Sequence, residues 1–154
     1  MIVQQGGVTA LLRLANEGTD RGRELASQAL AKIAITMDPN IAFKGERAAE
    51  LVRPLIRLLA SEDGLQNFES LMALTNLASM SEEIRVRIVK EKGLRTIEYL
   101  MFSEHEMIQR AATEAMCNLM VTEEVTCSLS FHSPFRVCPQ LSFFSPGLHL
   151  LRRG

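Results

Sequence analysis

The sequence predicts an all-α fold built from helical repeats, because two separate patterns of apolar residues recur in one register. The hexapeptide ALAKIA at residues 29–34 returns as ALTNLA at 73–78 and as AMCNLM at 115–120, with steps of 44 and 42 residues. An upstream pattern recurs at the same two steps, and its members are Val8, Leu11 and Leu14, then Val52, Leu55 and Leu58, then Leu94, Ile97 and Leu100. The chain therefore contains three related units.

The spacing between the two patterns indicates that each unit holds a packed pair of helices. Fifteen residues separate corresponding positions in every unit, as from Leu58 to Ala73, whereas the junctions between units differ in length. Helical units of about 40–47 residues are typical of armadillo or HEAT repeats, which bury their apolar faces by stacking on neighbours. We expect an armadillo-repeat right-handed superhelix of about three repeats, truncated. Its predicted interlayer core comprises Leu55, Leu58, Leu74, Leu77, Ile97, Leu100 and Leu119.

The first unit is expected to begin with only a few residues of a first helix, so the chain looks cut from a longer protein. Gly6 and Gly7 then provide the sharp turn before a second helix. The acidic loop at residues 17–20 precedes a long third helix that carries the hexapeptide. The predicted order within a unit is thus helix, tight turn, helix, loop and long helix.

The second unit is expected to open at Asp38 and Pro39 with a short first helix. Between Leu51 and Leu59 the apolar residues follow the i, i+3, i+4, i+7 rhythm of a helix buried on one face. Pro54 is expected in the first turn of this helix, where a proline sacrifices no helical hydrogen bond. The polar loop 61–64 leads to the third helix.

The third unit follows the same plan. Ser81 is predicted to cap a short helix over residues 84–92, with Glu82 and Glu83 facing the positive end of the helix dipole. Gly93 stands at the tight turn before the second helix, and the loop 103–106 precedes the third.

Composition excludes several classes of protein. The 154 residues suit one domain with an aliphatic core, and a net charge of −1 without a basic cluster argues against nucleic-acid binding. The chain has neither an apolar run of about eighteen residues nor a signal peptide at its start, so we expect a cytoplasmic protein without membrane contact. Cys117, Cys127 and Cys138 form an odd set that fits reduced thiols.

The segment 126–154 departs from the repeat. It contains no acidic residue, three arginines and three prolines, and it has no helical period. We therefore predict an armadillo-type domain over residues 1–125 and an irregular, disordered tail over 126–154. Because no fourth unit would cover the last repeat, self-association through uncapped ends of the stack is expected.

Three stretches resemble a specific family beyond the generic repeat pattern. They are GERAAELVRPLIRLL from Gly45, DGLQNFESLMALTNLAS from Asp63 and RAATEAMCNLM from Arg110, and they are similar to the UCS domain of the myosin-directed chaperones. The resemblance implies a partial C-terminal armadillo domain whose partner is the myosin motor domain. It also implies a longer protein with a tetratricopeptide domain that holds Hsp90. No tetratricopeptide pattern occurs here, so Hsp90 binding is not expected through this chain.

The candidate partner-binding residues lie at one face of the third helices. Asn76 and Asn118 occupy corresponding positions, where an asparagine amide offers both a donor and an acceptor to an extended peptide. An alternative carries equal weight: each asparagine binds its own neighbouring helix. Lys32 takes this position in the first unit, while Met72 and Glu114 stand one turn earlier in the other two. The predicted groove row is Lys32, Met72, Asn76, Glu114 and Asn118.

No arrangement typical of catalysis occurs in the sequence. There is no G-x-S-x-G turn, no phosphate-binding glycine loop, and no cysteine with evident histidine and acid partners. His105 stands alone in an acidic loop, and Cys127, His132 and Cys138 lack the spacing of structural zinc ligands. We expect a non-enzymatic protein without cofactor or metal that binds the myosin motor domain to assist its folding or assembly. The alternative is an armadillo-type scaffold segment whose groove binds no client.

Overall fold

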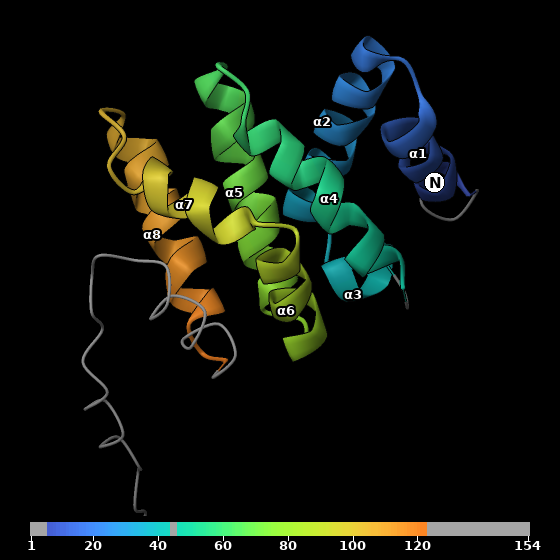
Figure 1. The fold of residues 1–154 in the computed structure, drawn as a ribbon. Helices are drawn as coiled ribbons and strands as arrows, with labels where there is room; N and C mark the ends of the chain where they lie inside the picture. The colour runs from blue at the N-terminus through green and yellow to red at the C-terminus, as the bar shows by residue number, and fades with distance from the viewer. Residues whose placement is uncertain (1–5, 44–45, 123–154) are drawn as a thin grey trace, which may run out of the picture.

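The computed structural model describes residues 6–43 and 46–122, which form eight helices and contain no strand (Figure 1). The helices are α1 Gly7–Glu17, α2 Asp20–Thr36, α3 Pro39–Ala42, α4 Arg47–Leu59, α5 Gly64–Ala78, α6 Glu82–Lys90, α7 Gly93–Leu100 and α8 Glu106–Leu119. Expectations for residues 126–154, including Cys127 and Cys138, lie outside the described residues.

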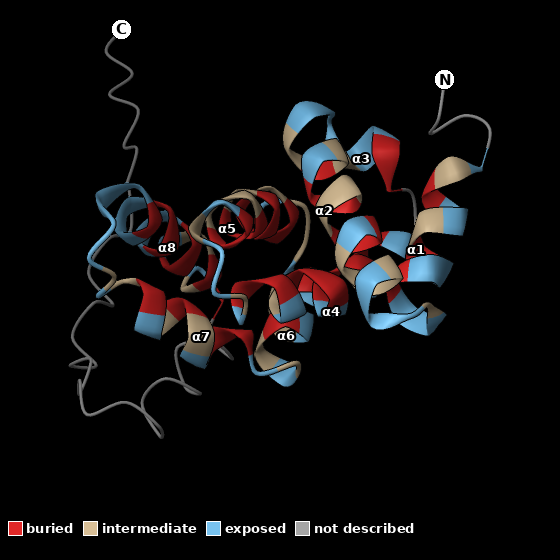
Figure 2. Ribbon diagram, turned by 90° about the horizontal axis from the view of Figure 1, so that it is seen from above, coloured by how far each residue is buried: buried red, intermediate tan, exposed pale blue. Residues whose placement is uncertain are grey.

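The helices form two layers. The long helices α2, α5 and α8 pack in sequence along one layer, and α1, α4 and α7 pack in sequence along the other. Figure 2 shows the two rows side by side, with α3 and α6 as short connections between units. The order of elements in the second and third units is the predicted one, which confirms the all-α armadillo-type fold.

The core lies between the two layers and between successive units (Figure 2). All seven residues predicted for it are at most 6% exposed. Leu14 differs, because it is 44% exposed although Leu58 and Leu100 at the corresponding positions are buried. The side chain of Leu14 lies over the turn at Gly18 instead, since the first unit has no described neighbour on its outer side.

The predicted capping residues at helix starts are confirmed, although the helix after Ser81 spans Glu82–Lys90 and not residues 84–92. The Oγ atom of Ser81 accepts a hydrogen bond from the backbone N–H of Ile84 at 3.4 Å, and Glu82 and Glu83 lie in the first turn. Asp38 caps the short helix α3 in the same way. These contacts satisfy backbone donors that have no partner within the helix.

The expectation for Pro54 was wrong, because Pro54 lies in the interior of α4 and not in its first turn. The helix begins at Arg47, since Ala48 already faces the core together with Leu51. A proline inside a helix removes one backbone hydrogen bond and costs about 3 kcal/mol. Burial of the pyrrolidine ring offsets part of that cost.

The turn before α7 also differs from the expectation. Lys92, and not Gly93, adopts the left-handed backbone conformation, with φ of 65°. Gly93 is required for space: a Cβ atom there would lie 2.9 Å from Cγ2 of Ile88 and 3.0 Å from Cδ1 of Ile56. Glycine at this position therefore allows α6, α4 and α7 to approach closely.

None of the helices in the described ranges is long and apolar enough to cross a lipid bilayer.

Candidate partner-binding surface

The five residues of the predicted groove row all lie on the layer of third helices. Lys32 is on α2, Met72 and Asn76 are on α5, and Glu114 and Asn118 are on α8. Because α5 packs against both α2 and α8, the structure brings the three helices into one surface. Lys32 and Glu114 are exposed, whereas the other three side chains are half-buried.

Both asparagines donate a hydrogen bond to the preceding unit. Asn76 Nδ2 lies 2.9 Å from the carbonyl oxygen of Ala34 on α2, and Asn118 Nδ2 lies 3.4 Å from that of Thr75 on α5. The two contacts span 42 and 43 residues, close to one repeat step. The repeated asparagine therefore fastens each third helix to the one before it.

The same side chains keep an acceptor for a partner. Within the described part of the chain, no hydrogen bond reaches Oδ1 of Asn76 or Asn118. An asparagine amide has an acceptor oxygen in addition to its two N–H donors. The two readings of these residues are thus compatible, because the nitrogen can brace the stack while the oxygen remains available to a peptide N–H.

The other three residues of the row are the charged Lys32 and Glu114 on the outer helices α2 and α8, and Met72 on the central helix α5. Lys32 Nζ lies 3.7 Å from Glu69 Oε1; the lysine of this long ion pair is exposed and the glutamate is half-buried, so the pair contributes little to stability. Met72 packs partly against the core and presents a thioether that adapts to varied shapes.

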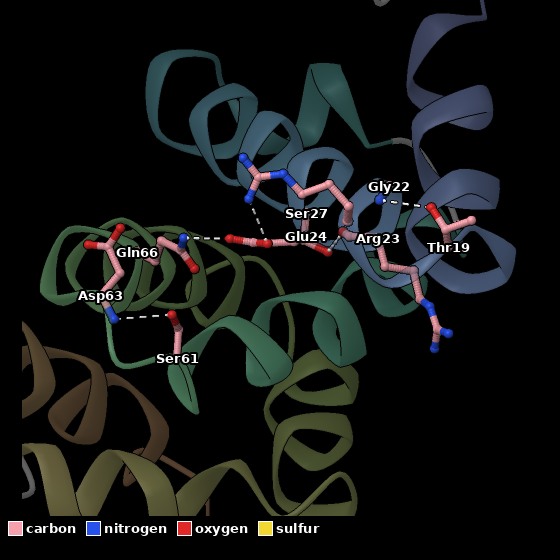
Figure 3. A network of polar contacts seen from close by, with 9 residues as sticks. Thr19, Gly22, Arg23, Glu24, Ser27, Ser61, Asp63 and Gln66 are labelled. Atoms are coloured by element: carbon pink, nitrogen blue, oxygen red, sulfur yellow. Dashed lines mark hydrogen bonds and ion pairs between the residues drawn. The ribbon is translucent and has the colours of Figure 1, made fainter.

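A second polar site, which the sequence analysis missed, lies at the amino-terminal ends of α2 and α5 (Figure 3). Gln66 Nε2 donates to Glu24 Oε1 at 2.9 Å, and Arg21 Nη1 donates to Glu24 Oε2 at 3.1 Å. A cavity of about 300 Å³ adjoins this pair. The alignment of the repeats could have revealed this site. Gln66 aligns with Ile108 one repeat later, so a polar residue occupies a position that faces the core.

Charge and hydrogen bonding perturb two groups at this second site. The hydrogen bond from Gln66, followed by that from Arg21, lowers the pKa of the Glu24 carboxyl. Burial lowers the pKa of the Arg57 guanidinium, and the neighbouring cations Arg23 and Arg53 act in the same direction. Glu24 is therefore held ionised as the acceptor of both contacts, and Arg57 stays protonated because an arginine titrates far above neutral pH.

Residues that could bind a metal do not gather in the described part of the chain, where no group of three or more His, Cys, Asp and Glu side chains forms. Cys117 is exposed with a free thiol, and His105 is also exposed.

The asparagine contacts lead to a stability prediction. Replacing both Asn76 and Asn118 with alanine removes two hydrogen bonds between units, each with a net contribution of about 0.5–1.5 kcal/mol. We expect the double variant to lower the free energy of unfolding by about 1–3 kcal/mol in denaturant titration. The matched control is Asn16→Ala, because Asn16 donates only within its own helix, to Leu12. Equal losses in the two variants would show that the asparagines do not brace the stack.

The lowered pKa of Glu24 leads to a pH prediction. A carboxyl whose folded pKa lies below its ordinary value of 4.5 contributes stability above that pH, and the contribution is lost as pH falls through the folded pKa. Thermal unfolding should show wild type more stable than Glu24→Gln at neutral pH, with the difference shrinking as the pH drops below 4.5. A difference that stays constant over this range would contradict the assignment.

The fold defines the class of protein: an armadillo-type α-solenoid in which the third helices α2, α5 and α8 pack side by side in one layer. No protein-family model matches the chain. The chain is 56% identical to protein unc-45 homolog B of Danio rerio over 126 residues, a match that covers 81% of this chain and 14% of the relative. The chain belongs to the UNC-45 family.

Solved structures agree with this assignment. The structure of UNC-45 from Drosophila melanogaster is 50% identical, has a TM-score of 0.80, and is matched over 84% of this chain and 16% of its own. The myosin chaperone UNC-45 from C. elegans, solved with an Hsp70 peptide, is 43% identical with a TM-score of 0.74, over 80% of this chain and 14% of its own. The chain thus spans about one seventh of the length of these relatives.

Proposed function

We propose that this chain is a non-enzymatic protein-binding module of a myosin-directed co-chaperone, and that it binds the myosin motor domain to assist its folding or assembly. The observation that carries the proposal is the relationship to the myosin chaperone UNC-45 of C. elegans, joined to a row on the third helices whose charged members, Lys32 and Glu114, are exposed. The contact assigned to the motor domain is the groove row Lys32, Met72, Asn76, Glu114 and Asn118.

The chemistry of the row supports a partly folded client. Asparagine oxygens accept hydrogen bonds from any backbone N–H, so they hold a chain without demanding one sequence. Met72 adapts to different apolar side chains. Lys32 and Glu114 lie at opposite ends of the row on α2 and α8, where they attract charged groups of either sign.

Binding to Hsp90 is not assigned to this chain, and the proposed binding of the myosin motor domain does not require it.

Self-association through the ends of the stack remains a further expectation, and light scattering of the isolated chain at increasing concentration measures it. A chain that is strictly monomeric at every concentration would remove that expectation without affecting the client surface.

The test compares aggregation of a denatured myosin motor domain after dilution, followed by light scattering, with and without the 154-residue chain. We expect the chain to suppress aggregation and the double variant Lys32→Ala, Glu114→Ala to lose most of this effect. Both replaced side chains are exposed, so the fold stays intact. The matched control is Glu83→Ala with Arg95→Ala, which changes two exposed charges on α6 and α7.

The competing function is a scaffold segment without a client groove. It predicts no suppression beyond that of an unrelated soluble protein, or equal suppression by both double variants. Either result would reject the proposed client surface.

A further inference from the structure

An apolar pocket lies between the amino-terminal ends of α5 and α8, two helices that pack side by side (Figure 1). The apolar part of its lining is Leu65, Phe68, Met107 and Ile108. Its volume of about 600 Å³ is within the range of binding sites in proteins. This α5–α8 pocket is distinct from the groove row, although Phe68 stands one turn before Met72 on α5.

Two large apolar side chains of this pocket are open to solvent. Leu65 is 63% exposed and Met107 is 60% exposed, and they occupy corresponding positions of successive repeats. The first repeat has Arg21 at this position, a charged residue of the kind expected on a solvated helix face. Single exposed apolar residues need no explanation, but neighbouring ones that line one pocket and have a polar rim mark an interaction surface.

The rim of the α5–α8 pocket is acidic. Glu106 lines the pocket, and three more exposed carboxylates lie in the loops that lead into the two helices, namely Glu62, Asp63 and Glu104. Within the described ranges none of the four forms an ion pair with a lysine or arginine. His105 is the one lining residue that can carry positive charge, and Arg110 lies outside the lining. The pocket therefore suits a segment that is apolar and basic.

The tail, residues 126–154, has the complementary composition. It contains no acidic residue, three arginines and four phenylalanines. Its stretch LSFHSPFRV at residues 129–137 carries Phe131 and Phe135, with Arg136 directly after the second ring. Phenylalanine rings bury large apolar areas, and an arginine pairs with carboxylates through several N–H donors. Pro134 disfavours a helix here, and residues four apart lie on the same side of an extended segment.

The same stretch is long enough to reach the pocket. The last described residue is Thr122, just past the carboxyl end of α8, and the pocket is at the amino end of this 14-residue helix, about 21 Å away at about 1.5 Å per residue. An extended chain spans about 3.3 Å per residue, so about seven residues return to the pocket. The stretch 129–137 begins at that point. Tethering gives it an effective concentration in the millimolar range, which favours it over a free partner of the same chemistry.

We propose that residues 129–137 dock in the α5–α8 pocket of the same chain. Phe131 and Phe135 cover the exposed side chains of Leu65 and Met107, and Arg136 lies against the acidic rim. This contact goes beyond the proposed function and does not depend on it, because it needs no myosin.

The first test follows the methyl resonance of Met107 by NMR in the 154-residue chain labelled at its methionine methyl groups. The double variant Phe131→Leu, Phe135→Leu removes both rings, and we expect it to shift this resonance while that of Met37 on α2 stays in place. The matched control, Phe143→Leu with Phe144→Leu, should leave both resonances unchanged. No shift in the first variant, or an equal shift in both, overturns the proposal. A Met107 resonance that moves on dilution of the wild type assigns the pocket to a second copy and also overturns it.

The second test changes the pocket and measures trypsin cleavage after Arg136, relative to cleavage after Arg153 in the same chain. We expect the double variant Leu65→Ser, Met107→Ser to raise this ratio about tenfold, because cleavage follows the population of undocked segment. The matched control is Ile41→Ser with Tyr99→Ser, which changes two exposed apolar residues outside the pocket and should leave the ratio unchanged. A ratio that is equal in wild type and the pocket variant overturns the proposal.

Discussion

Replacing Leu74 with alanine should lower the free energy of unfolding by about 2–5 kcal/mol, the largest effect expected within a single helix of the stack. Leu74 is 1% exposed and belongs to the repeated hexapeptide on α5, the helix that packs against α2, α4 and α8. Truncation removes buried methyl groups and leaves a cavity that the surrounding helices cannot fill completely. Denaturant titration by circular dichroism measures the loss.

The control for Leu74 lies on the same helix. Leu65 is 63% exposed, so Leu65→Ala removes the same atoms without opening a core cavity. We expect a change within about 0.5 kcal/mol there. Equal losses for the two variants would place Leu74 outside the core and would break the register on which the repeat assignment depends.

A second large effect is expected at Phe43, where alanine should cost about 3–5 kcal/mol. Phe43 is fully buried and is among the largest buried side chains of the described residues. It follows the short helix α3 and lines the space between α3, α4 and the start of α6. Its loss should loosen the junction between the second and third units.

The matched change for Phe43 is Phe102→Ala, because Phe102 is 68% exposed at the end of α7. Thermal unfolding of both variants gives the comparison. A melting temperature for Phe43→Ala as high as that for Phe102→Ala would show that the junction does not depend on the aromatic ring.

The repeat register was readable from the sequence because stacking imposes it on buried residues. Leu58, Leu77 and Ile97 must face neighbouring units, so their spacing survives as a pattern that needs no knowledge of the fold. Pro54 was misplaced for a related reason. Proline is usually a boundary signal, and packing around its ring outweighed that local preference.

The proposed client surface was only partly predictable. Aligned asparagines placed the predicted row on the third helices, since Asn76 and Asn118 recur at one position. Their bonds to Ala34 and Thr75 could not be read from the sequence, because those partners depend on how far one helix slides along the next. The cavity at Gln66 was missed because Gln66 and its partner Glu24 on the opposite wall are 42 residues apart in the sequence.

Hydrogen exchange of the 154-residue chain with and without a partly unfolded myosin motor domain tests the central claim most directly. The account predicts that the motor slows exchange in α2, α5 and α8, the layer that carries the groove row. The amides of α1, α4 and α7 on the opposite layer should exchange as in the free chain. Protection confined to that opposite layer, or no protection at all, would contradict the account.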